Sequence, residues 1–181
     1  MFHHPLHRRD FLYQSLLSGA CALGAGRVAA EEQPLPVLGQ GAFQYRPVAG
    51  WGVLDEKTPV KNCSAMVVDA QGRIYLLTDH LANNVIVYNK DGKLLKKWGT
   101  RFPGAHGLEI VKEDDREVLF ITDLNLHRVF KTTLDGEILM ELTYPQSTGK
   151  YASEKEYRPA WTLHLPNGDF FVLDGYGKDY I

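Results

Sequence analysis

Apolar and polar residues alternate in short runs along most of this chain, and short polar turns separate the runs. Such alternation is typical of β-strands that have one buried face. The tetrapeptide Asn-Lys-Asp-Gly at 89–92 is a strong signal for a hairpin turn. No segment after residue 30 has helical periodicity of useful length. The first set of runs predicts strands at 65–68, 74–78, 85–88 and 94–98.

A second set of runs repeats the first, and a third set begins. The second set predicts strands at 107–111, 118–122, 127–131 and 138–142, and the third at 161–165 and 170–173. Asp79, Asp123 and Asp174 mark corresponding positions. Twelve residues after each of the first two markers, an Asp-Gly pair follows.

The markers lie 44 residues apart (79 to 123) and then 51 residues apart (123 to 174). A four-stranded propeller blade repeats every ~40–45 residues. We therefore predict an all-β chain that forms a β-propeller, with two complete blades and part of a third. A β-sandwich gives no reason for the Asp-Gly offset to recur. Because blades bury their faces against neighbours, we expect this partial ring to leave strand 170–173 unpaired and to associate or aggregate.

The first thirty residues have the features of an export signal. Arg8 and Arg9 precede an apolar pair, a short apolar stretch covers 16–25, and small residues at 28–30 precede Glu31. The order resembles a twin-arginine signal peptide, and the apolar stretch is too short to span a bilayer. We predict a periplasmic or extracellular protein with a signal peptide (1–30), a linker leading into the first blade (31–62) and a partial propeller (63–181).

The amino-acid composition limits the kinds of partner that this chain can bind. The predicted signal holds three basic residues and one acidic residue, so the remaining chain carries 17 basic and 21 acidic residues, a net charge of −4. Nucleic-acid readers are basic, so we expect no nucleic-acid partner. Membrane attachment would come only through the signal or a weak lipobox at 18–21. Cys63 is the one cysteine after residue 30, so no internal disulfide forms, and we expect it to be buried. The irregular segment 143–157 is long enough to be a functional loop.

Three segments carry a family resemblance: Phe-Pro-Gly-Ala-His-Gly-Leu at 102–108, Thr-Asp-Leu-Asn-Leu-His-Arg-Val-Phe-Lys at 122–131 and Phe-Val-Leu-Asp-Gly-Tyr at 171–176. They resemble the lyase module of peptidylglycine α-amidating enzymes, a six-bladed propeller of the NHL-repeat class. The similarity covers about 63–181, the first half of such a ring. The resemblance implies cleavage of peptidyl-α-hydroxyglycine into a peptide amide and glyoxylate, with zinc held by three histidines and a structural calcium.

The resemblance also implies roles for single residues. His106 matches the first zinc histidine, Leu108 a position whose backbone carbonyl contributes to the calcium site, and Tyr176 the catalytic tyrosine that accepts a proton from the substrate hydroxyl. His106 begins an innermost strand, where Ser64 and Pro159 stand in the other copies, and such starts line the central channel. A catalytic zinc has three protein ligands and an open fourth position, and the other two histidines would lie beyond residue 181. The structural alternatives are a channel histidine bonded to water or a carbonyl, and a turn tyrosine.

Two departures count against the enzyme. The family's essential arginine would fall near Asp79, and no arginine stands there, while Arg73 and Arg101 do not match the motif. The cysteine that follows the catalytic tyrosine in animal lyases is Gly177 here. We interpret His127, which also falls on a recurrent family position, as a structural turn residue.

Four functions therefore stay open. The chain is a zinc-dependent lyase acting on a small-molecule or peptide substrate, a non-catalytic NHL module that binds a peptide or protein partner through its ring face, or a propeller hydrolase resembling gluconolactonases. The fourth is a truncated product without activity. Histidines at the starts of the later innermost strands would favour the lyase, carboxylates the hydrolase, and apolar or neutral residues the binding module.

Overall fold

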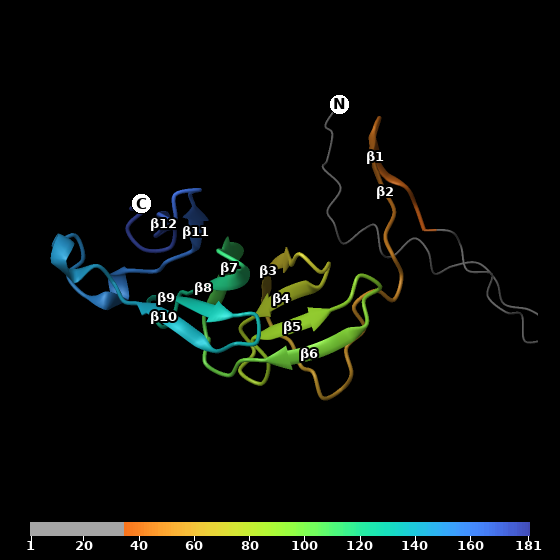
Figure 1. The fold of residues 1–181 in the computed structure, drawn as a ribbon, viewed down its shortest axis with the longest axis horizontal. Helices are drawn as coiled ribbons and strands as arrows, with labels where there is room; N and C mark the ends of the chain where they lie inside the picture. The colour runs from red at the N-terminus through yellow and green to blue at the C-terminus, as the bar shows by residue number, and fades with distance from the viewer. Residues whose placement is uncertain (1–34) are drawn as a thin grey trace, which may run out of the picture. The chain divides into compact units, whose positions relative to one another are not determined.

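The computed structural model describes residues 35–181. Apart from short 3-10 helices, all of their regular secondary structure is β-strand (Figure 1). They belong to two compact units, one ending at Pro47 and the other covering Val48–Ile181. The first unit contains an antiparallel hairpin of β1 (Leu38–Gln40) and β2 (Phe43–Tyr45), which lies inside the segment predicted as a linker. Of the described residues, no helix is long and apolar enough to cross a bilayer. The predicted signal peptide lies outside the described residues.

The second unit contains two four-stranded antiparallel sheets and one two-stranded sheet, and each follows the order of the chain. The first sheet consists of β3 (Cys63–Val68), β4 (Ile74–Thr78), β5 (Val85–Tyr88) and β6 (Leu94–Trp98). The second consists of β7 (Ala105–Glu113), β8 (Arg116–Asp123), β9 (Arg128–Thr133) and β10 (Ile138–Leu142), and the third of β11 (Trp161–His164) and β12 (Phe170–Leu173). Successive four-stranded meanders are the arrangement of propeller blades, so the prediction of a propeller-like all-β fold is confirmed. Within 35–181 the sheets form no closed ring.

The strand bounds follow the prediction closely, and β4, β5, β6, β10 and β12 coincide with it. The main difference is the hairpin of β7 and β8, which extends beyond its apolar residues. Its last cross-strand pairs are Lys112 with Glu117 and Glu113 with Arg116. Opposite charges across a sheet stabilise pairing, which explains why the strands continue where the hydrophobic pattern stops.

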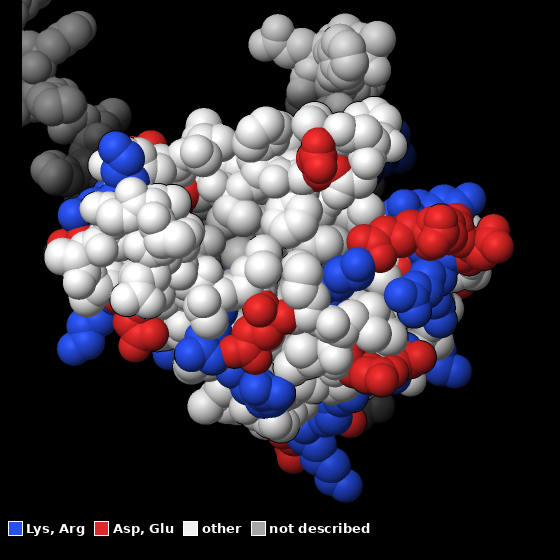
Figure 2. Space-filling view, turned by 60° about the vertical axis from the view of Figure 1, so that its left-hand side comes forward, with Lys and Arg blue, Asp and Glu red and all other residues white. Residues whose placement is uncertain are grey.

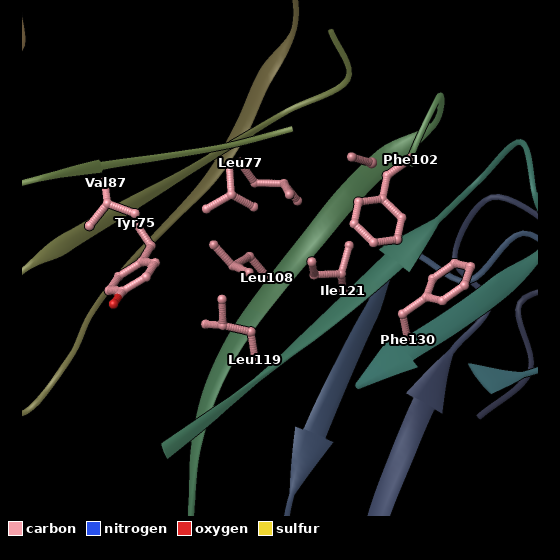
Figure 3. Packing of buried hydrophobic residues seen from close by; sticks show 10 residues of the cluster. Tyr75, Leu77, Val87, Phe102, Leu108, Leu119, Ile121 and Phe130 are labelled. Carbon is pink, nitrogen blue, oxygen red and sulfur yellow. The ribbon is translucent and has the colours of Figure 1, made fainter. Parts of the chain in front are cut away.

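The main core lies between the first and second sheets (Figure 3). Tyr75 and Leu77 from β4 are fully buried there with Leu108 from β7 and Ile121 from β8. Successive strand residues point to opposite faces, so Val118, Phe120 and other alternate residues of the second sheet face a second cluster, which includes Phe170 and Val172 of β12. The second sheet is therefore covered on both faces, as expected of a blade between neighbours.

The marker aspartates have a common structural role. Each is the last residue of the second strand of its sheet or directly follows that strand, and each accepts a hydrogen bond from a backbone N–H shortly before the innermost strand. The bonds join Asn62 to Asp79 (3.0 Å), Gly104 to Asp123 (3.0 Å) and Arg158 to Asp174 (2.6 Å). A carboxylate that satisfies a backbone donor in this way fixes where the innermost strand begins, which is the physical reason for the sequence repeat.

The Asp-Gly pairs form the predicted turns before the outer strands. Gly92 and Gly136 have φ values of +80° and +92°, a conformation that side chains other than glycine rarely adopt. Each donates its N–H to the carbonyl three residues earlier, Asn89 at 3.0 Å and Thr133 at 3.1 Å. The turn prediction from these dipeptides is therefore confirmed.

The prediction that Cys63 is buried is wrong. Cys63 is an exposed free thiol at the start of β3, which pairs with β4 alone. Met66 and Val68 on the same strand are also exposed, at 51% and 56%. In the described part of the chain, nothing covers this face of β3, so even its apolar residues are accessible.

The segment 143–157 contains two short 3-10 helices, η2 (Gln146–Thr148) and η3 (Glu154–Glu156). Tyr151, which stands between these two helices, is buried and donates its hydroxyl hydrogen to Asp174, at 2.9 Å. Burial, together with this bond, raises the pKa of the Tyr151 phenol. The segment is thus packed onto the marker carboxylate of the third sheet.

Candidate functional site

His106 is the second residue of β7, beside an irregularity in register between Ala105 and Leu108. Its ring is half-buried, and Nδ1 lies 3.0 Å from the carbonyl oxygen of Ala160, just before β11. A carbonyl only accepts hydrogen bonds, so Nδ1 must carry the hydrogen. In the neutral ring Nε2 then has a free lone pair, which is the form of histidine that binds a metal.

Tyr176 lies in the turn after β12, and its side chain is 55% exposed. Its ring meets the ring of His106 edge-on, with centroids 4.9 Å apart and planes at 68°. Residues 70 positions apart in the sequence, one from each of two neighbouring blades, are therefore brought into contact. The structure brings together the two side chains to which the family resemblance assigns the zinc and proton-transfer roles.

The Ala160 carbonyl has a second donor. The hydroxyl of Thr122, at the end of β8, lies 3.0 Å from the same oxygen, and it accepts the N–H of Gly107 at 2.8 Å. A Cβ on Gly107 would stand 2.5 Å from the Ala160 oxygen and 2.7 Å from Thr122 Oγ1. Only glycine allows this approach, so Gly107 is what lets β7, β8 and the chain before β11 converge.

Sequence reasoning missed Thr122 and Ala160 as parts of the site. Thr122 stands inside the Thr-Asp run that carries the family resemblance, so its position was visible although its role was not. Ala160 contributes a backbone carbonyl, which leaves no mark on the side-chain pattern. Ser64 makes a similar bond one blade earlier, from its hydroxyl to the Ala105 carbonyl at 3.3 Å. The bond from His106 thus also serves to join neighbouring blades.

The other predicted residues lie apart from this contact. The side chain of Leu108 is fully buried in the main core, opposite Ile121 on β8, so a role in a calcium site would rest on its backbone carbonyl alone. His127 has a φ of +59°, and its Nδ1 is 2.7 Å from the carbonyl of Tyr157. It is a turn residue, as interpreted from the sequence.

The charged side chains near the position expected for the family's arginine lie close to other polar or charged groups. Asp79 stands where the family has its arginine, and it binds Asn62. Arg73 pairs with Asp69 at 2.5 Å and Arg101 lies 3.9 Å from Glu141. On the face that Figure 2 presents, basic and acidic side chains are interspersed, without a broad area of positive charge.

Among the described residues, His106 has the geometry of a metal-binding histidine. His106 has the held Nδ1 and the free Nε2 that a metal-binding histidine needs. Within residues 35–181, however, no three side chains of the kinds His, Cys, Asp and Glu lie close enough together to hold a metal ion. Zinc normally takes three or four protein ligands, so His106 fits as one member of a set and does not form a site by itself.

Comparison with known proteins supports the resemblance over part of the chain. The chain is 36% identical over 87 residues to "Peptidyl-alpha-hydroxyglycine alpha-amidating lyase 1" of Drosophila melanogaster. The match covers 47% of this chain and 16% of that lyase, so the chain corresponds to a minor part of the lyase's length. No protein-family model matches the chain.

A solved structure is also similar over a larger part of the chain. It belongs to a Bacteroides fragilis protein described as a "Putative exported protein", with a TM-score of 0.45 and 17% sequence identity. The similarity covers 67% of this chain and 32% of that protein.

Proposed function

We propose that this chain supplies part of the active site of an exported, NHL-type propeller lyase that cleaves peptidyl-α-hydroxyglycine. The observation that carries the proposal is the contact between His106 and Tyr176, with ring centroids 4.9 Å apart. The partial match to the Drosophila lyase supports it, because the chain shares 36% identity with that enzyme over 87 residues.

The reaction needs two proton movements. The substrate hydroxyl loses its proton, its oxygen becomes the carbonyl oxygen of glyoxylate, and the carbon–nitrogen bond breaks with its electron pair going to nitrogen. That nitrogen takes up a proton and leaves as the peptide amide. We assign the first step to Tyr176, whose half-exposed phenol is accessible to substrate. Tyr176 would accept this proton as its phenolate, the form that positive charge close by stabilises near neutral pH.

His106 would hold zinc through Nε2, and the metal would polarise a substrate oxygen and lower the pKa of a bound hydroxyl. The remaining ligands would come from outside residues 35–181. The edge-on contact with His106 would keep the Tyr176 ring beside the substrate hydroxyl. We further propose a structural calcium that uses the Leu108 carbonyl.

The first thirty residues direct the proposed export. Arg8 and Arg9 before a short apolar stretch, and small residues before Glu31, support a twin-arginine signal that is cleaved before Glu31. An exported chain would meet peptide substrates outside the cytoplasm. Mass spectrometry of the exported protein should find an N-terminus at Glu31, and an intact Met1 start would contradict this part of the proposal.

The direct test is glyoxylate release from a synthetic peptidyl-α-hydroxyglycine by the zinc-loaded full-length protein. Tyr176→Phe should lower kcat/KM by about 10²–10⁴, the usual contribution of a general base. His106→Ala should also lower it, because the zinc would lose a ligand. The His106 variant should also bind less zinc, whereas Tyr176→Phe should bind as much as the wild type.

Matched controls replace the same residue types outside the site. Tyr45→Phe removes a hydroxyl from the separate β1–β2 hairpin, and His80→Gln changes a loop histidine whose Nδ1 accepts the N–H of Ala82. Both should keep full activity. Equal zinc content in wild type and His106→Ala, or wild-type activity in Tyr176→Phe, would contradict the proposal.

A non-catalytic module that binds a peptide or protein through its ring face is the second candidate. The observation that favours it is the acidic Asp79, bound to Asn62, in the place of the family's arginine. Peptide binding by wild type that is unchanged in Tyr176→Phe, with no glyoxylate released, would select this candidate.

A further inference from the structure

We infer that Thr122 is a positioning residue: it holds in place the Ala160 carbonyl, whose hydrogen bond fixes the tautomer and orientation of His106. Its hydroxyl joins both the backbone that follows His106 and the carbonyl that accepts the His106 hydrogen bond. The importance of this role for catalysis rests on the proposed function. The role itself concerns only the position of one hydrogen on His106, which can be measured without any metal or substrate.

The direction of each hydrogen bond follows from the groups involved. The N–H of Gly107 can only donate, so Thr122 Oγ1 accepts it at 2.8 Å. The Thr122 hydroxyl hydrogen is then available for the Ala160 carbonyl, 3.0 Å away, since that carbonyl can only accept. A carbonyl oxygen has two lone pairs, so the second remains for Nδ1–H of His106, also at 3.0 Å.

Burial makes this arrangement rigid. Thr122 is 1% exposed, so water does not compete for its hydroxyl. A β-branched side chain has few χ1 rotamers, which limits where the hydroxyl points. Because Gly107 has no side chain, Thr122 and the Ala160 carbonyl approach its backbone closely. A Cβ at this position would stand only 2.7 Å from Thr122 Oγ1. One hydroxyl group therefore holds both the backbone next to His106 and the carbonyl that accepts the His106 hydrogen bond.

The preceding blade shows that this arrangement is not required to join blades. Ser64 donates to the Ala105 carbonyl there, at 3.3 Å. Thr78 precedes its marker aspartate as Thr122 does, but its hydroxyl accepts the N–H groups of Lys61 (3.1 Å) and His80 (3.2 Å). Among residues 35–181, a threonine hydroxyl bonds the carbonyl that joins two blades only in the blade of His106, where Thr122 bonds Ala160.

The experiment measures the ring-nitrogen chemical shifts of His106 in the ¹⁵N-labelled full chain, at a pH where the ring is neutral. The wild type should show mainly the Nδ1–H tautomer. Thr122→Val keeps the shape and removes the hydroxyl, and should move the population toward the mixture of a solvent-exposed histidine. Thr122→Ser keeps the hydroxyl and should match the wild type. His127 is held by the Tyr157 carbonyl and is the internal control.

A second measurement connects the inference to the metal. Loss of a group that orients a metal-binding histidine typically lowers metal affinity about 10–100-fold, so zinc binding should fall by that factor in Thr122→Val and not in Thr122→Ser. If Thr122→Val does not fold, Thr122→Cys replaces it, because a thiol is a much weaker donor and acceptor of similar size.

The two proposals can fail separately. A wild-type His106 with its hydrogen on Nε2, or the same tautomer population in all the Thr122 variants, would overturn the positioning role whatever the zinc content. Absence of zinc binding and of glyoxylate release, together with a tautomer that depends on the Thr122 hydroxyl, would refute the proposed function and leave the positioning role in place.

Discussion

Gly107→Ala is the most informative single change in the described part of the chain. The new methyl carbon would lie 2.5 Å from the Ala160 carbonyl oxygen, 2.7 Å from Thr122 Oγ1 and 3.1 Å from Trp161 Cε3. None of these atoms is the far end of a flexible side chain. The substitution must therefore push the chain before β11 away from β7.

The expected cost follows from two effects. Overpacking of a closely packed site costs about 1–3 kcal/mol. Separating Thr122 from Gly107 or Ala160 leaves a buried polar group without a partner, which costs about 1–3 kcal/mol. Together they amount to about 2–6 kcal/mol, a large share of the ~5–15 kcal/mol that stabilises a typical domain.

The assay is urea unfolding followed by tryptophan fluorescence. Since urea m-values for small domains are about 1–3 kcal/mol/M, the midpoint should fall by about 1–3 M. Gly175→Ala is the matched control, because its added methyl would also face Ala160 but at an ordinary contact distance of 3.5 Å. That control should stay within about 0.5 kcal/mol of the wild type. If both variants unfold at the same urea concentration, the close approach at Gly107 is not what the geometry indicates.

Three further predictions concern other parts of the chain. His164 packs against Phe120 and Phe170, and burial lowers its pKa below the ordinary value. Because the unfolded chain takes up this proton first, stability should fall as pH drops below about 6.5, less so in His164→Asn, as pH-dependent urea midpoints would show. Asp123→Asn removes an acceptor from a carboxylate that binds three backbone N–H groups, and should lower stability by about 1–3 kcal/mol in urea unfolding. Replacing Arg8 and Arg9 by Lys should abolish export in cell fractionation, and unchanged export would contradict the twin-arginine signal.

The sequence predicted the strands well because alternation and turn residues are local features. The bounds of β4 and β5 coincide with the prediction, since both strands are apolar runs bounded by polar turns. The extension of β7 and β8 was missed because its side chains are charged, and a hydrophobic pattern does not detect ion-paired strands. The β1–β2 hairpin was read as linker because it is only three residues per strand.

The site was predictable only in part, and for a different reason. His106 and Tyr176 were identified from a family resemblance, and their contact depends on the way two blades face each other, which no local pattern specifies. Thr122 belongs to a segment that carries the family resemblance, but the sequence does not show that its hydroxyl bonds the backbone carbonyl of Ala160. Backbone acceptors have no sequence signature, so the hydrogen bonds that orient His106 could be found only in the structure.

The bonds of the marker aspartates close the hairpin of the first two strands within each sheet. Asp123 holds the chain at Gly104, directly before β7, and Asp174 holds it at Arg158, three residues before β11 begins. The additional residues that separate the third marker from the second fall in 143–157, outside both of these closed hairpins. Insertions between sheets are therefore accommodated without disturbing strand register, and copies could be added or lengthened by duplication while His106 and Tyr176 keep their places.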